Sequence, residues 1–257
     1  MDTCGCRKLE DTEGQLFPQI GALSRHRNLS LERLKPLFAT ESGSESQVEV
    51  YIYVLSSVYM KNGAFVQHGC APNYQGGYIT LCTCKHQMRA RRPESGKWTG
   101  AWIAGVTSRS ASRGFSGEHH LFYLMRVASE FESHMDLWHK AGLSGHAKQS
   151  KCASISEFGD LFRPHKQNGE PFNIQSYDEP VLGHRHHRSS NDRNWHKDIC
   201  YPKSRSGRRP ALLVGEPAHS FLWTRPSLSF TRKLPRDYLH RHDLKGFLGA
   251  LRDAAVQ

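Results

Sequence analysis

Residues 68–108 read HGCAPNYQGGYITLCTCKHQMRARRPESGKWTGAWIAGVTS. The stretch holds a loop rich in Gly, Pro and Asn, an apolar strand that ends at Lys85, a basic cluster, and another strand that ends at Ser108. Binding and catalytic residues are often found on loops that a rigid scaffold positions. The stretch therefore predicts a β-sheet that presents a polar loop beside concentrated positive charge.

Hydrophobic patterning outside this stretch indicates the fold class. Runs rich in Val, Ile, Tyr and other β-forming residues predict strands over residues 47–60, 78–84, 98–107, 120–131, 210–214 and 219–223. Helical spacing predicts helices over 29–38, capped by Ser30, over 133–141, capped by Ser133, and over 237–255, whereas 148–170 reads as irregular. This order, without regular strand–helix alternation, favours an α+β fold: a curved, mostly antiparallel sheet flanked by helices, with long basic loops.

The domain organisation follows from the same patterning. We expect residues 1–46 to be an N-terminal extension with one short helix, ending in the linker-like run ESGSES at 41–46. We expect residues 47–257 to form a single α+β domain with a C-terminal helix.

Composition narrows the class of protein. Hydrophobic residues make up 37% and charged residues 23% of the 257 residues, and no run of eighteen apolar residues or signal-peptide core is visible, so a cytoplasmic protein is expected. The seven cysteines show no paired CxxC spacing, which favours reduced thiols over a structural zinc site.

The formal charge of +11 is concentrated in two segments. Residues 85–113 carry seven basic residues against Glu94 alone, and residues 184–209 carry eight against two aspartates, a net of +6 each. Such concentration favours a polyanionic partner, most often nucleic acid, although a solvated basic face with no partner is the alternative. Neither segment forms an amphipathic helix suited to a membrane surface.

The loop at 68–77 offers recognition chemistry. Pro72 fixes a backbone angle, and Gly76 allows a ligand to approach the chain closely. Asn73 then supplies an amide that both donates and accepts, and Tyr74 a ring that can stack on a base. An ordinary tight turn is the competing interpretation.

The basic residues after the second strand are candidates for phosphate contacts. These are Lys85, Arg89, Arg91 and Arg92, with Arg109 after the next strand. Lys85 would serve as a Schiff-base nucleophile only if desolvation lowered its pKa, so phosphate binding is the favoured role.

The densest polar cluster is NDRNWHKDICYP at residues 191–202. Asp198 precedes apolar residues and is the candidate catalytic carboxylate, able to orient water or stabilise an oxocarbenium-like sugar. A salt bridge to Arg193 or Lys197, both also candidate phosphate ligands, is the alternative role. Trp195 and His196 are candidate base contacts.

Known catalytic and metal motifs are absent from the sequence. It contains no P-loop, dinucleotide fingerprint, HExxH, GxSxG or deaminase signature, so we expect no nucleotide cofactor. The HxHH group of His184, His186 and His187 lacks a well-spaced acidic or cysteine partner, so we expect a solvated loop rather than a metal site.

The order of these blocks resembles the nucleotide-modification-associated domain 2 family. The resemblance covers residues 48–230 and lies in APNYQGGYITLCTCKHQMRARR, WTGAWIAGVTS, LFYLMRV, HKDI and ALLVGEPAHSFLW; the chain departs from the family pattern at residues 99–101. The family is associated with hypermodified DNA bases, so the resemblance implies recognition of, or action on, such bases.

The activity implied by the resemblance is that of a DNA glycosylase in antiviral defence against bacteriophage. It would bind double-stranded DNA, flip a modified base, glucosylated hydroxymethylcytosine being the expected one, and excise it to leave an abasic site without a cofactor. Asn73 would assist Asp198 at the base. A non-catalytic reader of modified bases and an enzyme that remodels a modification are the alternatives.

Overall fold

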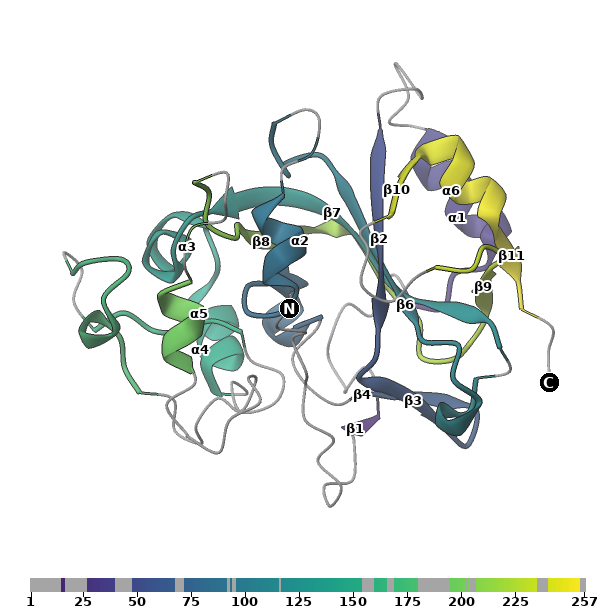
Figure 1. Ribbon diagram of the computed structural model, residues 1–257, viewed down its shortest axis with the longest axis horizontal. Helices are drawn as coiled ribbons and strands as arrows, with labels where there is room; N and C mark the ends of the chain where they lie inside the picture. The colour runs from purple at the N-terminus through teal and green to yellow at the C-terminus, as the bar shows by residue number, and fades with distance from the viewer. Residues whose placement is uncertain are drawn as a thin grey trace. The chain divides into compact units, whose positions relative to one another are not determined.

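The computed structural model describes the following residues: 15–16, 27–39, 48–67, 72–91, 93, 96–115, 117–153, 160–165, 169–179, 195–201, 203, 207–234 and 240–254. They fall into two compact units (Figure 1). Unit 1 comprises the described residues within His68–Thr99 and Val127–Glu216, and unit 2 comprises those within Thr12–Gln67, Gly100–Arg126 and Pro217–Gln257. The linker expected at 41–46 lies outside the described residues, and the division of the chain expected there stays a prediction.

The molecule is an α+β protein with a mixed, mostly antiparallel sheet, as the sequence predicts. In unit 2 the strand order is β10 (His240–Asp243), β2 (Glu49–Leu55), β6 (Trp102–Thr107), β7 (His119–Phe131) and β8 (Leu212–Leu222). The pair β2 and β6 is parallel, and β10–β2 and β6–β7 are antiparallel. The residues of β7 and β8 are divided between the two units, and in unit 1 β5 (Thr80–Leu81) pairs antiparallel with the first residues of β8.

The remaining elements of unit 2 lie around this sheet. They are β1 (Gln15–Leu16), α1 (Leu31–Ala39), β3 (Val58–Lys61), β4 (Ala64–Gln67), η4 (Ala111–Arg113), β9 (Leu228–Phe230), α6 (Leu244–Ala250) and β11 (Leu251–Asp253). Helices α1 and α6 both contact β11 (Figure 1). The hairpin β3–β4 and β1 form a separate three-stranded sheet.

Large aromatic side chains fill the core of unit 2. The rings of Phe38 and Trp102 lie 4.5 Å apart, and the buried hydroxyls of Tyr53 and Tyr123 are 2.6 Å apart. Gly105 leaves room for the Tyr123 ring, because a Cβ there would lie 2.3 Å from one of its carbons. This close contact with a side chain lies at a point where the β6–β7 register shifts.

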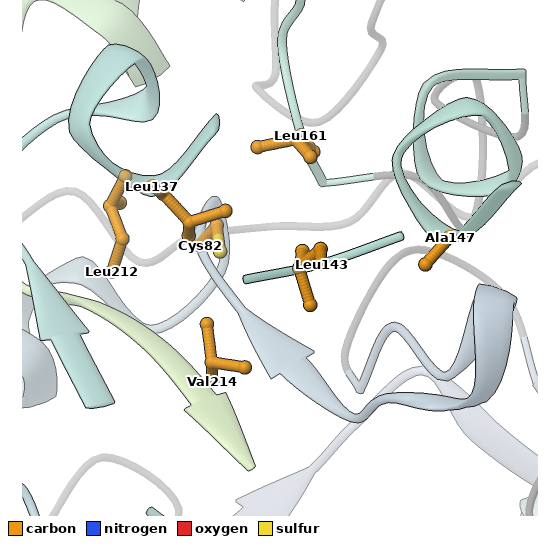
Figure 2. Close-up of a cluster of buried hydrophobic side chains, with 7 residues drawn as sticks. All are labelled: Cys82, Leu137, Leu143, Ala147, Leu161, Leu212 and Val214. Carbon is orange, nitrogen blue, oxygen red and sulfur yellow. The ribbon is translucent and has the colours of Figure 1, made fainter. Parts of the chain in front are cut away.

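Unit 1 is richer in helices and loops. Its other elements are η3 (Gln75–Gly77), α2 (His86–Ala90), α3 (His134–Lys140), α4 (Gly145–Ala153), η5 (Ile174–Ser176) and α5 (His196–Ile199). Figure 2 shows the cluster in which α3, α4, β8 and the segment after β5 meet, through Cys82, Leu137, Leu143, Ala147, Leu161, Leu212 and Val214. A second buried cluster joins Met135, Phe162, Tyr177, Trp195 and Ile199.

Several predicted elements have different limits in the structure. The strand expected over 47–60 is two strands, β2 and β3, and the strands expected over 210–214 and 219–223 are one strand, β8. The irregular segment expected from 148 begins inside α4, which the Ser144 hydroxyl caps by accepting from Ala147 N. The prediction of one long helix over 237–255 is wrong. Asp243 caps the short helix α6, and Leu251 lies in β11, where it pairs with Phe230.

Candidate functional site

A cavity of about 200 Å³ in unit 1 lies where the two basic segments meet. The first segment contributes Arg89, and the second contributes Lys203, Arg208 and Arg209. The end of β7 and the residue after it add the carboxylates of Glu130 and Glu132. The two segments thus line one site, although Arg89 and Lys203 are more than a hundred residues apart in sequence.

Arg89 is fixed in the wall of this cavity by backbone carbonyls. Its Nε donates to Cys84 O (2.8 Å) and its Nη1 to Ala211 O (2.6 Å). Its Nη2 is buried without a hydrogen-bond partner among the described residues. The side chain is 1% exposed, so the expected role as a surface contact to backbone phosphates does not fit Arg89.

The wall that carries Arg209 is also held in place. Arg209 Nη1 donates to Tyr201 O (2.6 Å), and its guanidinium carbon lies 3.8 Å from the centre of the Phe172 ring. The Tyr201 ring in turn stacks on His86 at 4.8 Å, and its hydroxyl donates to Thr83 O (3.2 Å). These contacts tie the segment after α5 to the segment that begins α2.

A buried polar cluster lies beneath the loop that the sequence singles out. Lys151 Nζ, from α4, donates to Asn73 Oδ1 (2.6 Å), Thr80 Oγ1 (2.8 Å) and Tyr78 O (2.9 Å). Asp160 accepts from Thr80 Oγ1 (2.7 Å) and from Cys82 N (3.0 Å). Asn73 is fully buried, and its Nδ2 has no hydrogen-bond partner among the described residues.

Burial dominates the electrostatics of this cluster. Desolvation lowers the pKa of Lys151 to about 8, although nearby Asp160 opposes the shift. Desolvation also raises the pKa of Cys152 to about 12 and that of Cys82 well above its usual value, with Asp160 adding to both shifts. Near neutral pH both thiols stay protonated, so they are poor nucleophiles.

The loop itself packs tightly onto α4. Gly76 has a φ of 73°, and a Cβ there would lie 2.6 Å from the Cα of Ala147. Gly76 therefore allows a close approach, but to a helix of the same chain rather than to a ligand. Tyr74 is 1% exposed, so its ring is not available for the expected stacking on a base.

The segment around Asp198 forms the short helix α5 in the same unit. Asp198 is buried at 3% exposure. Trp195 is also buried, with its ring 5.5 Å from Phe162 and 4.5 Å from the half-buried His196, so it packs in the core rather than offering a free face. Asp198 does not line the cavity, and Asn73 makes its side-chain hydrogen bonds with Thr80 and Lys151 rather than with Asp198.

The other predicted phosphate ligands are dispersed. Arg91 and Lys197 are exposed in unit 1, and Lys85 is half-buried there with a left-handed φ of 57°. Arg109 is exposed in unit 2, where its Nε donates to Gly117 O. Arg92 and Arg193 lie outside the described residues, as do Asn194 and the three histidines of the HxHH group.

Several site residues were not singled out from the sequence. Lys151 and Asp160 lie in a stretch that reads as irregular, and only the tertiary fold shows that they are buried together. Glu130 lies near the end of β7 and Glu132 follows that strand, and their spacing matches no known motif. Lys203, Arg208 and Arg209 were counted in the second basic segment, so the charge concentration was the signal that pointed to them.

The described part of the chain contains no group of three or more His, Cys, Asp or Glu side chains placed to hold a metal ion. Among the same residues no helix is long and apolar enough to cross a membrane. Comparisons with family models, curated proteins and solved structures returned no match.

Proposed function

We propose that the protein binds double-stranded DNA and hydrolyses the N-glycosidic bond of a modified base, with glucosylated hydroxymethylcytosine as the expected substrate. The observation that carries this proposal is the cavity at which Arg89, from one basic segment, meets Lys203, Arg208 and Arg209 from the other. A site that gathers positive charge from distant parts of a chain suits a polyanionic ligand. The resemblance of residues 48–230 to a family linked to hypermodified bases supplies the substrate class.

The reaction needs one carboxylate and one water. Water adds to C1′ of the sugar as the bond to the base nitrogen breaks, and the base leaves with a proton. A carboxylate assists by accepting a proton from water or by stabilising the positive charge on the sugar. Asp198 is the carboxylate that we propose from the sequence, and Glu130 and Glu132 are the two that line the cavity.

Asn73 supports a role for the loop in this chemistry. Its Oδ1 is held by Lys151, so the orientation of the amide is fixed, and its Nδ2 keeps an unused donor. A buried donor without a partner is unfavourable by about 1–3 kcal/mol, so such groups are often completed by a ligand. Because the fold encloses this Nδ2, we propose that it contacts the substrate only after the loop has moved away from α4.

The direct test uses three DNA duplexes of one sequence that carry glucosylated hydroxymethylcytosine, hydroxymethylcytosine or cytosine at one position. After incubation, mass spectrometry detects the released base, and alkali cleaves the strand at abasic sites. Release of the glucosylated base alone, with matching strand breaks, supports the proposal. No released base from any duplex at a molar excess of protein contradicts it.

Three substitutions then identify the carboxylate: Asp198→Asn, Glu130→Gln and Glu132→Gln. Glu179→Gln is the control, because Glu179 is exposed in the same unit and does not line the cavity. The substitution that removes excision while leaving DNA binding and the melting temperature unchanged marks the catalytic group.

A second candidate function is a reader of modified bases that performs no chemistry. It is favoured by the position of Asp198, which neither lines the cavity nor bonds to the Asn73 side chain. A reader would bind the glucosylated duplex saturably and more tightly than the unmodified one, without releasing a base, and all three carboxylate variants would bind alike.

A further inference from the structure

We infer that His120, on β7, is an acid-sensitive latch that holds β9 and β11 in place through Ser229 and Glu118. The inference goes beyond the proposed function and does not depend on it, because the residues involved lie in unit 2 and no nucleic acid takes part. The latch is closed while the His120 ring is neutral, and a second proton on the ring opens it.

A chain of hydrogen bonds joins the residue before β7 to both strands. The Ser229 hydroxyl, on β9, donates to Glu118 Oε2 (2.7 Å), and its oxygen lies 3.3 Å from His120 Nδ1. The other carboxylate oxygen, Glu118 Oε1, accepts from Arg252 Nη2, on β11. Glu118 is thus held by β9 and β11 at once, and His120 completes the chain from β7.

This chain fixes the position of the proton on the neutral ring. The bond from Ser229 lowers the pKa of Glu118 from 4.5, so near neutral pH the carboxylate is ionised and can only accept. A serine hydroxyl has a single proton, and Ser229 gives it to Glu118, so His120 Nδ1 must donate to Ser229 Oγ. Acid therefore adds the second proton at Nε2, to a ring that is only 6% exposed.

The surroundings of His120 disfavour a positive charge on it. Burial lowers the pKa of the ring below its ordinary 6.5. Glu118 opposes this shift, whereas His119 on β7 and Arg252 on β11 add to it, and β9 contributes the uncharged Ser229. The stability that the neutral ring provides is thus complete above pH 6.5, and it is lost as the pH falls through the lower pKa of the folded state.

His119, beside it on β7, is also neutral in this structure. Its Nδ1 donates to Thr107 O (2.7 Å), and its Nε2 accepts from Leu234 N (3.1 Å), so the ring has no place for a second proton while both bonds last. The two adjacent histidines therefore hold residues 228–234 in their neutral forms. A variant at His120 is needed to separate its effect from that of His119.

Protonation of His120 would place two positive groups beside one carboxylate. Arg252 is the group that can leave, because its side chain is 57% exposed whereas His120 is enclosed. The next residue, Asp253, accepts from Leu31 N at the start of α1 (3.2 Å). Release of Arg252 would therefore loosen β11 and, with it, the start of α1.

The test is hydrogen exchange of backbone amides, followed by NMR between pH 7.5 and 5. Protection factors are compared, so that the intrinsic pH dependence of exchange is removed. The reporters are the amides of Thr231 and Ala254, which donate backbone hydrogen bonds at the two ends of the β9–β11 pair. The reference is the amide of Ser108 in the same unit, which donates to Leu55 O (3.2 Å) beyond the β2–β6 pair.

Two variants and a control complete the design. His120→Asn keeps a donor near the position of Nδ1 but does not titrate, so protection should fall less in acid. Arg252→Gln removes the guanidinium at an exposed position, so β11 should already be loose at pH 7.5 and should respond little to acid. The control is His146→Asn, because His146 is exposed on α4 in unit 1.

We expect the protection factors of Thr231 and Ala254 to fall below pH 6.5 in the natural protein and in the control, and to fall less at Ser108. The part of this fall that His120→Asn removes should reach at most about tenfold per pH unit, the limit for one titrating group. An equal fall at Ser108, or an undiminished fall in His120→Asn, overturns the inference. If His120→Asn does not fold, Arg252→Gln decides, since an acid response as large as that of the natural protein would equally overturn it.

Discussion

Lys151 Nζ lies 2.6 Å from Asn73 Oδ1, and neither side chain is exposed to solvent. This contact joins α4 to the loop that precedes β5, across 78 residues of sequence. The same ammonium group bonds to Thr80 Oγ1, which in turn donates to Asp160. The loop and the first residue of β5 are therefore anchored by a buried cation rather than by apolar packing alone.

Replacing Lys151 should destabilise the fold strongly. Lys151→Met keeps much of the side-chain volume but leaves Asn73 Oδ1 and Tyr78 O without their donor, and it removes the positive charge near the buried Asp160. Each of these two buried acceptors left without its donor should lower the free energy of unfolding by about 1–3 kcal/mol. Urea unfolding measures it.

The matched control for this experiment is Lys148→Met. Lys148 lies on the same helix, only half-buried, with its Nζ 5.4 Å from the centre of the Trp138 ring. Its replacement should change the free energy of unfolding by at most about 1 kcal/mol. Equal losses in the two variants would refute the anchoring role of Lys151.

The stability of the protein should depend on pH through Lys151. Its pKa is about 8 in the folded state and 10.5 ordinarily, so between these values the unfolded chain binds more protons than the folded one. The contribution of Lys151 to the free energy of unfolding is therefore least favourable below pH 8, and it rises with pH above 8. Between pH 8 and 9 this rise should reach about 1 kcal/mol.

The pH range of this measurement matters. Burial raises the pKa values of Cys82, Cys152 and Tyr177, so these groups lower the stability as pH rises above about 9. The quantity to plot is the difference between the natural protein and Lys151→Met, in which the contributions of groups that do not interact with Lys151 cancel. A flat difference from pH 7.5 to 9 would show that Lys151 is not titrating in this range.

The two adjacent glycines of the loop should respond differently to alanine. Both have a positive φ, 73° at Gly76 and 82° at Gly77, which is unfavourable for alanine by about 1–2 kcal/mol. Only at Gly76 would the new Cβ clash with the backbone of Ala147, whereas at Gly77 nothing lies within 4 Å. Gly76→Ala should therefore lose about 1–3 kcal/mol more than Gly77→Ala in thermal or urea unfolding. Equal losses would mean that the loop moves away from α4 without penalty.

DNA binding should depend on salt through the residues of the cavity. Each phosphate contact contributes about 0.9 to the slope of log K against log salt concentration. If Lys203 and Arg208 contact phosphates, replacing both by Gln should reduce the slope by about 2. Fluorescence anisotropy with a labelled duplex at several salt concentrations gives the slope, and the double replacement of Arg232 and Lys233 is the reference. An unchanged slope would place the DNA elsewhere on the protein.

Local patterns predicted the elements whose ends are set by nearby residues. The helix after β7 begins after Ser133, whose hydroxyl accepts from Asp136 N, and the strands β6 and β7 lie where β-branched and aromatic residues are dense. The C-terminal helix was predicted too long because Leu244, Phe247 and Leu251 share helical spacing, although Leu251 pairs with β9. Tertiary pairing overrides local propensity at that point.

The positive charge of the candidate site could be predicted from the sequence, but the burial of its side chains could not. Clustered Lys and Arg residues indicated two basic segments, and both contribute to the cavity. The sequence gives no sign that Arg89, Tyr74 and Trp195 are enclosed, because contacts with distant residues such as Ala211 and Phe162 enclose them. For the same reason Lys151 and Asp160 escaped notice, since a buried lysine has no signature in the sequence.

The interleaving of the two units has a consequence for synthesis on the ribosome. Strand β2 pairs with β6 on one side and with β10 on the other, and β10 is translated long after both. Until then the nascent sheet keeps an open edge that can pair with another chain. Unit 2 cannot close before the segment from Pro217 has emerged, whereas the last segment of unit 1 ends at Glu216. A chaperone that shields the open edge of β2 until β10 has been translated should therefore raise the yield of folded protein.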